Sequence, residues 1–331
     1  MTEDTTEKTK KKVSASDFFN KDVVSIRDFS KEQIDFVLEL AKEIEERPRL
    51  YSEAMKRKIM VPLFFEPSSR TCTSFQMAMM RMGGSVLDFD VEQSSIKKGE
   101  TLKDTAVMFR GYKPDVVVIR HPLEGSAKLF ADIVGFPVIN AGDGKNQHPT
   151  QTILDLYTIK EILGDINGAK IGIVGDLKYG RTTHSLSFAL SRYSGVNMIY
   201  VSPDELRMPS SICTESRNNG ARIIEKPLKD LERVISDVDI LYMTRIQRER
   251  FPKGDEGERQ YAQICSEYRL TIKMLERAGN KNVKIMHPKP KIDEIEAEID
   301  DSEYAYYPKQ EANGVYNREA ILFLILGGQK I

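Results

Sequence analysis

The fold is decided by the stretch FFEPSSRTCTSFQ, which covers residues 64–76. An apolar run from Ile59 to Phe65 leads into it, and Pro67 ends that run. From Phe75 to Met82 apolar residues recur at helical spacing, and Gly83-Gly84 closes the pattern. A short apolar run, a break and a period of 3.6 residues predict a strand, a loop and a helix in succession.

The hydroxyls and the arginine of Ser68-Ser69-Arg70-Thr71 fall where this predicted helix begins. Backbone N–H groups lack partners there and the helix dipole is positive, so the position suits a bound anion, phosphate above all. The same residues also suit a serine N-cap followed by a surface arginine. The two interpretations are evenly balanced on this stretch alone, and the rest of the chain has to decide between them.

Composition limits the class of protein. At 331 residues the chain is long enough for two domains, and its 40% hydrophobic and 30% charged residues are typical of a soluble globular protein. A net charge of −1 and the absence of a long apolar run favour neither nucleic acid nor a membrane as partner. Three cysteines and four histidines lack disulfide or metal-ligand spacing, so we expect no metal site and a reducing, cytoplasmic location. Residues 1–16 are polar, and we expect a disordered tail rather than a secretory signal.

Strand and helix patterns alternate along the chain and restart after Gly164. Near-continuous apolar runs such as Asp115–Arg120 are typical of parallel strands covered on both faces. The alternation predicts an α/β protein with two doubly wound domains, each a mainly parallel sheet flanked by helices. A long helix predicted from Thr150 to Leu163 would bridge them. We expect a mobile loop at Arg245–Arg269, which is charged and contains glycines, and a last helix that begins at Arg318.

Polar and charged residues follow six of the predicted strands at their carboxyl ends. In open α/β sheets these ends share one rim, where ligands bind. An ordinary surface position is the better interpretation of any one of these residues. Taken together they favour a ligand with several anionic groups, because guanidinium binds carboxylate and phosphate in bidentate geometry. The clusters are Ser68–Thr71, Arg120–Pro122, Asn140 with Asn146–Gln151, Asp176 with Lys178 and Arg181, Thr244–Gln247, and His287–Lys291.

A nucleotide site is disfavoured. The run Gly172–Asp176 lacks the G-x-G-x-x-G spacing, and the next strand ends without an acidic residue placed for a ribose. The sequence contains no G-x-x-x-x-G-K-[ST] pattern either.

These clusters contain long motifs through which the chain, from Phe18 to Leu326, resembles the aspartate/ornithine carbamoyltransferases. The matching motifs are SSRT (68–71, for the family's S-T-R-T), KKGET (97–101), RHP (120–122), NAGDGKNQHPTQ (140–151), GDLKYGR (175–181) and TRIQRER (244–250). Three features favour the aspartate branch over the ornithine branch: the TRIQRER motif, HPKP at 287–290, and the lack of an S-M-G loop. The chain departs from the family pattern at Ser69, Cys72, Gln76, Lys289 (where leucine is expected) and Lys291.

The resemblance implies transfer of a carbamoyl group from carbamoyl phosphate to the α-amine of L-aspartate, without a cofactor. The products are N-carbamoyl-L-aspartate and phosphate, an early step of pyrimidine biosynthesis. It also implies a carbamoyl-phosphate-binding domain at 17–149 plus 307–331, and an aspartate-binding domain at 150–306. Two alternatives stay open: another amine acceptor such as ornithine, and a non-catalytic chain of the same fold that binds an anionic metabolite.

The resemblance also assigns roles to individual residues. The catalytic residues are Arg70, Thr71, Arg120, His148 and Gln151. Carbamoyl phosphate would meet these five together with Ser68, Ser69, Pro288 and Lys289, and with Ser94 and Lys98 of a neighbouring chain. Aspartate would meet Lys98, Arg181, Arg245 and Gln247. For domain closure we expect Glu66 to pair with Arg181 or Arg250, and Glu249 to hold Lys178. The implied assembly is a homotrimer with sites shared between subunits. Zinc-containing regulatory chains can bind to this trimer.

Overall fold

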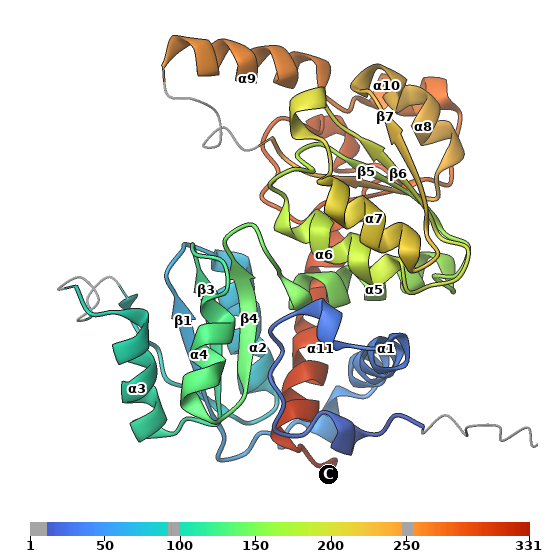
Figure 1. Cartoon of the computed structure of the whole chain (residues 1–331). Coiled ribbons are helices and arrows are strands. Elements are labelled where there is room, and N and C mark those ends of the chain that lie inside the picture. Colours follow the sequence, from blue (N-terminus) through green and yellow to red (C-terminus); the bar gives the residue numbers. More distant parts are fainter. Residues whose placement is uncertain (1–11, 92–93, 95–98, 247–253) are drawn as a thin grey trace, which may run out of the picture.

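The computed structural model describes residues 12–91, 94, 99–246 and 254–331, which form two parallel sheets (Figure 1). The strand order is β2-β1-β3-β4 in the first sheet and β7-β6-β5-β8-β9 in the second. The strands are β1 (Ile59–Phe64), β2 (Ser85–Val86), β3 (Val116–His121), β4 (Val138–Asp143), β5 (Lys170–Val174), β6 (Asn197–Val201), β7 (Arg222–Lys226), β8 (Ile240–Met243) and β9 (Lys284–Met286). The predicted α/β class with two doubly wound sheets is confirmed.

Helices cover both faces of the first sheet. Val117 of β3 points into one core and the next residue, Val118, into another, because successive strand residues face opposite sides. The first of these cores is closed by α3 (Leu102–Tyr112) and α4 (Ser126–Val134), and the second by α1 (Lys31–Glu46) and α2 (Ser69–Arg81). Burial on both faces explains why this strand is apolar almost without interruption.

The second sheet is covered in the same way. Ile173 of β5 packs on the side of α6 (Arg181–Leu190) and α7 (Ser210–Asn218). The neighbouring Val174 packs on the opposite side. That side carries α8 (Leu231–Asp237), α9 (Asp255–Glu267) and α10 (Ile272–Ala278). The sheet therefore has no open face along this strand, so a ligand of this sheet would have to bind at the rim of the sheet.

Two helices, α5 (Pro149–Leu163) and α11 (Tyr307–Leu326), join the two units (Figure 1). α5 is buried without a break from Pro149 to Ile159, as expected of a helix with no solvent-facing stripe. α11 packs against α1, α2 and α5. One hydrophobic core contains Val118 of the first sheet and Tyr242 of the second. The predicted bridging helix is confirmed, and α11 lies beside it as a second connection.

The prediction of a loop throughout 245–269 is wrong, because residues 255–267 form α9. Tyr261, Ile264 and Cys265 lie on one side of this helix and pack against the core of the second sheet. Its first turn is acidic, which suits the positive end of a helix dipole. The many charged residues of this segment hid a short apolar stripe. Residues 247–253 lie outside the described part of the chain.

The last helix begins at Tyr307 rather than at Arg318. The part before Arg318 carries Gln310, Asn313 and Asn317, which are buried and hydrogen-bonded. Buried polar residues break the apolar period, so the sequence pattern predicted only the second half. Helix α7 was not predicted at all.

Residues 1–11 of the expected tail lie outside the described residues, while Ser14 caps a short 3-10 helix at Ala15–Asp17. Among the helices described, none has the length and apolar character that crossing a membrane requires. The described residues also contain no group of three or more His, Cys, Asp or Glu side chains arranged for a metal ion. The three cysteines are free thiols.

Candidate active site

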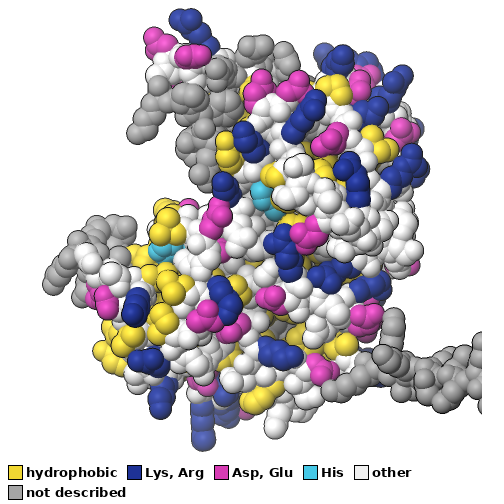
Figure 2. Space-filling view, in the orientation of Figure 1, with side chains coloured by type: hydrophobic (Ala, Val, Ile, Leu, Met, Phe, Trp, Pro, Cys, Tyr) yellow, Lys and Arg dark blue, Asp and Glu magenta, His cyan; other side chains and the backbone are white. Residues whose placement is uncertain are grey.

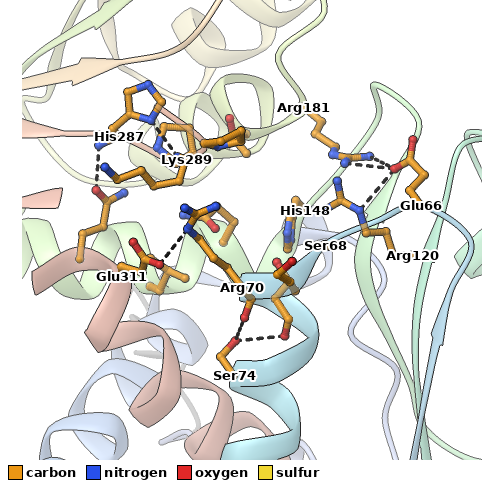
Figure 3. Close-up of a pocket in the computed structure, with 18 of the residues that line it drawn as sticks. Glu66, Ser68, Arg70, Ser74, Arg120, His148, Arg181, His287, Lys289 and Glu311 are labelled. Carbon is orange, nitrogen blue, oxygen red and sulfur yellow. Dashed lines mark hydrogen bonds and ion pairs between the residues drawn. The ribbon is translucent and has the colours of Figure 1, made fainter. Parts of the chain in front are cut away.

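A cavity of about 970 Å³ opens between the two sheets, at the rim where the strand-end clusters were predicted to meet (Figure 3). Figure 2 shows the surface hollowed between the two units, with charged and histidine side chains gathered along the hollow. The cavity is lined by these predicted site residues: Glu66, Ser68, Ser69, Arg70, Thr71, Arg120, His148, Gln151, Arg181, Arg245, Pro288 and Lys289.

The N-terminus of α2 forms one wall of the cavity. Ser68 occupies the N-cap position, but within the described part of the chain its side chain makes no capping hydrogen bond. Ser68 therefore stands at the N-cap position without the hydroxyl bond that a capping serine makes. Thr71 is buried in the first turn, and Arg70 is half exposed with its Nε 2.8 Å from Oε1 of Glu311. These hydroxyls, the guanidinium and the helix terminus make a cradle for an anion such as phosphate.

Glu66 lies between two arginines of opposite walls (Figure 3). Its Oε2 is 3.3 Å from Nη2 of Arg181 and 3.4 Å from Nε of Arg120. The Arg181 contact has hydrogen-bond geometry, whereas the Arg120 contact is a charge contact only. Burial, followed by the charge of Arg181, lowers the pKa of Arg120 to about 10 although Glu66 opposes this. Arg120 thus stays cationic at neutral pH in a poorly hydrated place, where its charge acts strongly on a ligand.

His148 is buried at the N-cap position of α5. Burial lowers its pKa well below the usual value, and the charges of Arg181, Arg120 and Arg318 lower it further. The imidazole is therefore neutral at physiological pH, and one ring nitrogen carries a proton to donate. Among the described residues, its Nδ1 has no hydrogen-bond partner.

The reach of Arg181 across the cavity depends on a glycine. Arg181 begins α6 in the second unit, and its Nη1 donates to the carbonyl of Gly144 in the first unit at 2.8 Å. Gly142 has a φ of +117°, and a Cβ there would lie 2.9 Å from Cζ of Arg181. Any larger residue at position 142 would push the guanidinium away from this wall.

A loop after β9 forms the remaining wall. His287 is buried, its Nε2 is 2.7 Å from Oε1 of Glu294, and its Nδ1 accepts from the Lys289 backbone N–H at 2.8 Å. This bond holds Lys289 in the left-handed region, with a φ of +57°. The Lys289 ammonium lies 4.1 Å from the centre of the Tyr307 ring. Burial lowers its pKa, and the neighbouring cation Lys291 contributes in the same direction.

Comparison with known protein families identifies relatives of this chain. The carbamoyl-phosphate-binding domain model of the aspartate/ornithine carbamoyltransferases matches residues 21–161, and their aspartate/ornithine-binding domain model matches residues 167–325. The chain belongs to the aspartate/ornithine carbamoyltransferase family. The resemblance stated from the motifs is confirmed.

Related proteins within this family are aspartate carbamoyltransferase catalytic subunits. That of Thermococcus gammatolerans is 51% identical over 94% of this chain and 99% of its own length, and that of Methanopyrus kandleri is 47% identical over 95% and 99%. Among solved structures, Trypanosoma cruzi aspartate transcarbamoylase in complex with N-(phosphonacetyl)-L-aspartic acid is 35% identical with a TM-score of 0.87, covering 94% of this chain and 97% of that one. The catalytic subunit of M. jannaschii aspartate transcarbamoylase is 44% identical with a TM-score of 0.82, covering 91% of this chain and 96% of that one.

The resemblance assigned Ser94 to a neighbouring chain's site and Lys178 to domain closure. Both are described, and neither lines the cavity as the described residues define it. Ser94 donates to the carbonyl of Val91, and the Lys178 ammonium lies 5.3 Å from the centre of the Tyr179 ring. Four further residues lie outside the described part of the chain: Lys98, Gln247, Glu249 and Arg250.

The sequence patterns missed part of the carbamoyltransferase cavity. Glu311 and Arg318 line it from α11, whose first half was not recognised as a helix. Burial lowers the pKa of Arg318 to about 10, and this guanidinium lies over the ring of Phe75, 5.0 Å from its centre. The sequence signal that could have identified Arg318 is an arginine at the start of an otherwise apolar helix.

Proposed function

We propose that this chain is the catalytic subunit of an aspartate carbamoyltransferase, which converts carbamoyl phosphate and L-aspartate into N-carbamoyl-L-aspartate and phosphate. One observation carries the proposal: a single cavity has the α2 anion cradle on one wall and Arg181 and Arg245 on another. An anionic donor with a phosphate and an acceptor with two carboxylates fit these walls. The T. cruzi relative has been solved in complex with carbamoyl phosphate and aspartate, which supports the same pair of ligands.

In the proposed reaction the α-amine attacks the carbamoyl carbon, a C–N bond forms, and a tetrahedral oxyanion results. The C–O bond to phosphate then breaks, and the amine proton passes to a phosphate oxygen. Ser68, Ser69, Arg70 and Thr71 hold the leaving phosphate. Thr71, Arg120 and the neutral His148 donate to the oxyanion. Gln151 and the backbone around Pro288 and Lys289 orient the reacting nitrogen, and placement of the two substrates supplies much of the rate enhancement.

The assay that tests this function supplies carbamoyl phosphate with one amine at a time and measures both phosphate and the carbamoylated product. Turnover with L-aspartate, and none with ornithine, supports the proposal. Turnover with ornithine or another amine instead would mean that the chain is a carbamoyltransferase that uses a different acceptor. No turnover with any amine would favour a non-catalytic, anion-binding chain.

We assign carbamoyl phosphate to a domain of residues 17–149 plus 307–331, and aspartate to residues 150–306. Glu66 belongs to the first and Arg181 to the second, so their ion pair joins the domains near the cavity. In this proposal closure of the domains excludes water and strengthens the electrostatics of the site. Pairs of Glu66 with Arg250 and of Glu249 with Lys178 are further members of the same closure mechanism.

Replacing Glu66 by alanine should raise the KM for aspartate about tenfold, equivalent to about 1.4 kcal/mol, because Arg181 loses the partner that holds it in the cavity. Initial rates over a range of aspartate concentrations measure this. The control is Glu53→Ala, which removes an exposed ion pair with Lys56 away from the cavity. An aspartate KM and a kcat both equal to those of the unmodified chain would refute the closure role of Glu66.

We further propose a cytoplasmic homotrimer whose sites lie between subunits, with Ser94 and Lys98 contributed by the neighbour. Exposed apolar side chains on and near α2 and α3 support an interface there: Met77, Met80, Leu87, Val107 and Tyr112. Zinc-containing regulatory chains would join this trimer in a larger holoenzyme. The native mass with and without such a partner distinguishes the two assemblies.

Shared sites predict complementation. Trimers of Arg70→Ala and of Lys98→Ala should each lose most of their activity, and hybrids of the two should regain part of it, because some interfaces then contain both intact residues. Hybrids of Arg70→Ala with Arg120→Ala are the matched control, since both residues belong to the same subunit's wall and no interface is intact. Purified hybrids without any recovery would mean that each chain holds a complete site.

A further inference from the structure

Asp155 is a buried carboxylate that accepts hydrogen bonds from three parts of the molecule. It lies on α5, one turn after Gln151, and is not accessible to solvent. Its Oδ1 accepts from Nε2 of Gln151 at 2.9 Å and from Nε2 of Gln310 at 2.6 Å. Its Oδ2 accepts from the hydroxyl of Tyr242 at 2.8 Å. None of the sequence motifs singled out this residue, and it does not line the cavity as described.

The polarity of these contacts follows from hydrogen-bond chemistry. An ionised carboxylate can only accept, so each amide must turn its nitrogen toward Asp155. For Gln310 a second bond fixes the same orientation independently, because its Oε1 accepts from the backbone N–H of His287 at 2.8 Å, and that group can only donate. For Gln151 the nitrogen is committed to Asp155, which leaves Oε1 as the group that the amide offers to the cavity.

The same carboxylate reaches a second wall of the cavity through Gln310. Gln310 holds the backbone of His287, and His287 in turn accepts from the backbone N–H of Lys289. Asp155 therefore connects the Gln151 amide with the loop that contains Pro288. Both were assigned above to the orientation of the reacting nitrogen.

Burial raises the pKa of Asp155 to about 7, although the hydrogen bonds from Gln310, Tyr242 and Gln151 and the charge of Arg318 all favour the ionised form. An apolar or amide side chain would avoid the cost of burying this charge. When the carboxyl is protonated, its proton lies on Oδ2 beside the Tyr242 hydroxyl, because Oδ1 faces the NH₂ group of Gln310. Oδ1 therefore accepts from both amides in either protonation state.

We propose that Asp155 is a positioning residue that fixes the polarity of the Gln151 amide, so that an oxygen rather than an NH₂ group faces the reacting nitrogen. The inference rests on the proposed function. Both the carbamoyl NH₂ group and the attacking amine carry N–H bonds, and an acceptor is the partner they require. An inverted amide would set a donor against a donor in a buried site.

The test begins with Asp155→Leu, which keeps roughly the size of the side chain but removes the oxygen that both amides share and so leaves the Gln151 amide free to invert. The kcat should fall roughly 10- to 100-fold, while the KM for carbamoyl phosphate changes much less. Thr158→Val is the matched control, because Thr158 is buried on the same helix and bonds to Asn313 of α11 without reaching the cavity. It should leave kcat unchanged.

A double-mutant cycle separates positioning from general stability. In a Gln151→Ala background, Asp155→Leu should lower kcat by less than about threefold, because its effect passes through the missing amide. A fold-loss equal to that in the unmodified background would overturn the proposal.

A conservative variant keeps the proposal testable if Asp155→Leu folds poorly. In Asp155→Asn the side-chain oxygen can still accept from Gln151 and Gln310, while its NH₂ group donates to the Tyr242 hydroxyl. This variant should keep its kcat within about threefold of the unmodified chain, and a loss as large as that of Asp155→Leu would count against the proposal. If the unmodified chain carbamoylates no amine, the proposed function fails. If it is active and the cycle is additive, only the role of Asp155 fails.

Discussion

Replacing Arg120 by alanine should lower kcat by on the order of 10²–10³, the usual cost of losing one donor to a developing oxyanion. Arg120 is mostly buried, and its Nη1 donates to the carbonyl of Ala141 at 3.3 Å, which holds the guanidinium at the end of β3. Its charge is poorly hydrated and lies beside the neutral His148. A fixed cation in such surroundings stabilises new negative charge without reorganising first.

Steady-state kinetics with both substrates measure this loss. The control is Arg49→Ala, which removes an exposed arginine that does not line the cavity and should leave kcat within about twofold. A variant whose KM for carbamoyl phosphate rises while kcat stays constant would assign Arg120 to ground-state binding alone.

Replacing Arg70 by alanine should lower kcat more than it weakens binding of carbamoyl phosphate. Negative charge on the phosphate grows as the C–O bond breaks, so a cation in the α2 cradle stabilises the transition state more than the bound substrate. The expected loss in kcat is again on the order of 10². Glu311, whose Oε1 lies 2.8 Å from Nε of Arg70, would lose this partner while still lining the cavity, and its negative charge should add to the effect.

Equilibrium binding of carbamoyl phosphate, measured by calorimetry without aspartate, has to accompany the kinetics of this variant. Arg233→Ala, an exposed arginine on α8, is the control for loss of a positive charge. Equal losses in affinity and in kcat would make the α2 terminus a binding loop rather than a cradle for the leaving group.

The strand–loop–helix that opens the cavity was predictable because its signals are local. Apolar residues of β1 end at Pro67, and the helical period of α2 starts within a few residues. The choice between an N-cap and an anion site was not local. It depends on side chains from other strand ends, such as Arg120 and His148, which line the same cavity as Ser68.

Residues on α11 and α9 were harder to predict, for two different reasons. Gln310 and Asn313 are polar but buried, because they bond to side chains more than 100 positions earlier in the chain. Contacts with such distant partners cannot be recognised from the hydrophobic periodicity of the sequence. In α9 the many charged residues made the few apolar ones hard to recognise as a helical stripe. Their role becomes clear only from their packing against the core of the second sheet.

Asp155 illustrates the same limit within the site. It follows Gln151 by one helical turn, in a stretch whose pattern indicates only a bridging helix. Only the positions of Gln310 on α11 and Tyr242 on β8 reveal that its two oxygens are shared among three donors. Residues that line the cavity could be predicted from motifs, whereas the residue that we propose to orient one of them could not.

The central claim, that this chain joins the carbamoyl carbon to the α-nitrogen of aspartate, is tested most directly by isotope labelling. The purified chain is incubated with ¹³C-labelled carbamoyl phosphate and ¹⁵N-labelled L-aspartate, and the product is observed by ¹³C NMR. The account predicts a carbamoyl signal split by one-bond coupling to ¹⁵N, with phosphate released in equal amount. Phosphate release with no ¹³C–¹⁵N coupled product would contradict it.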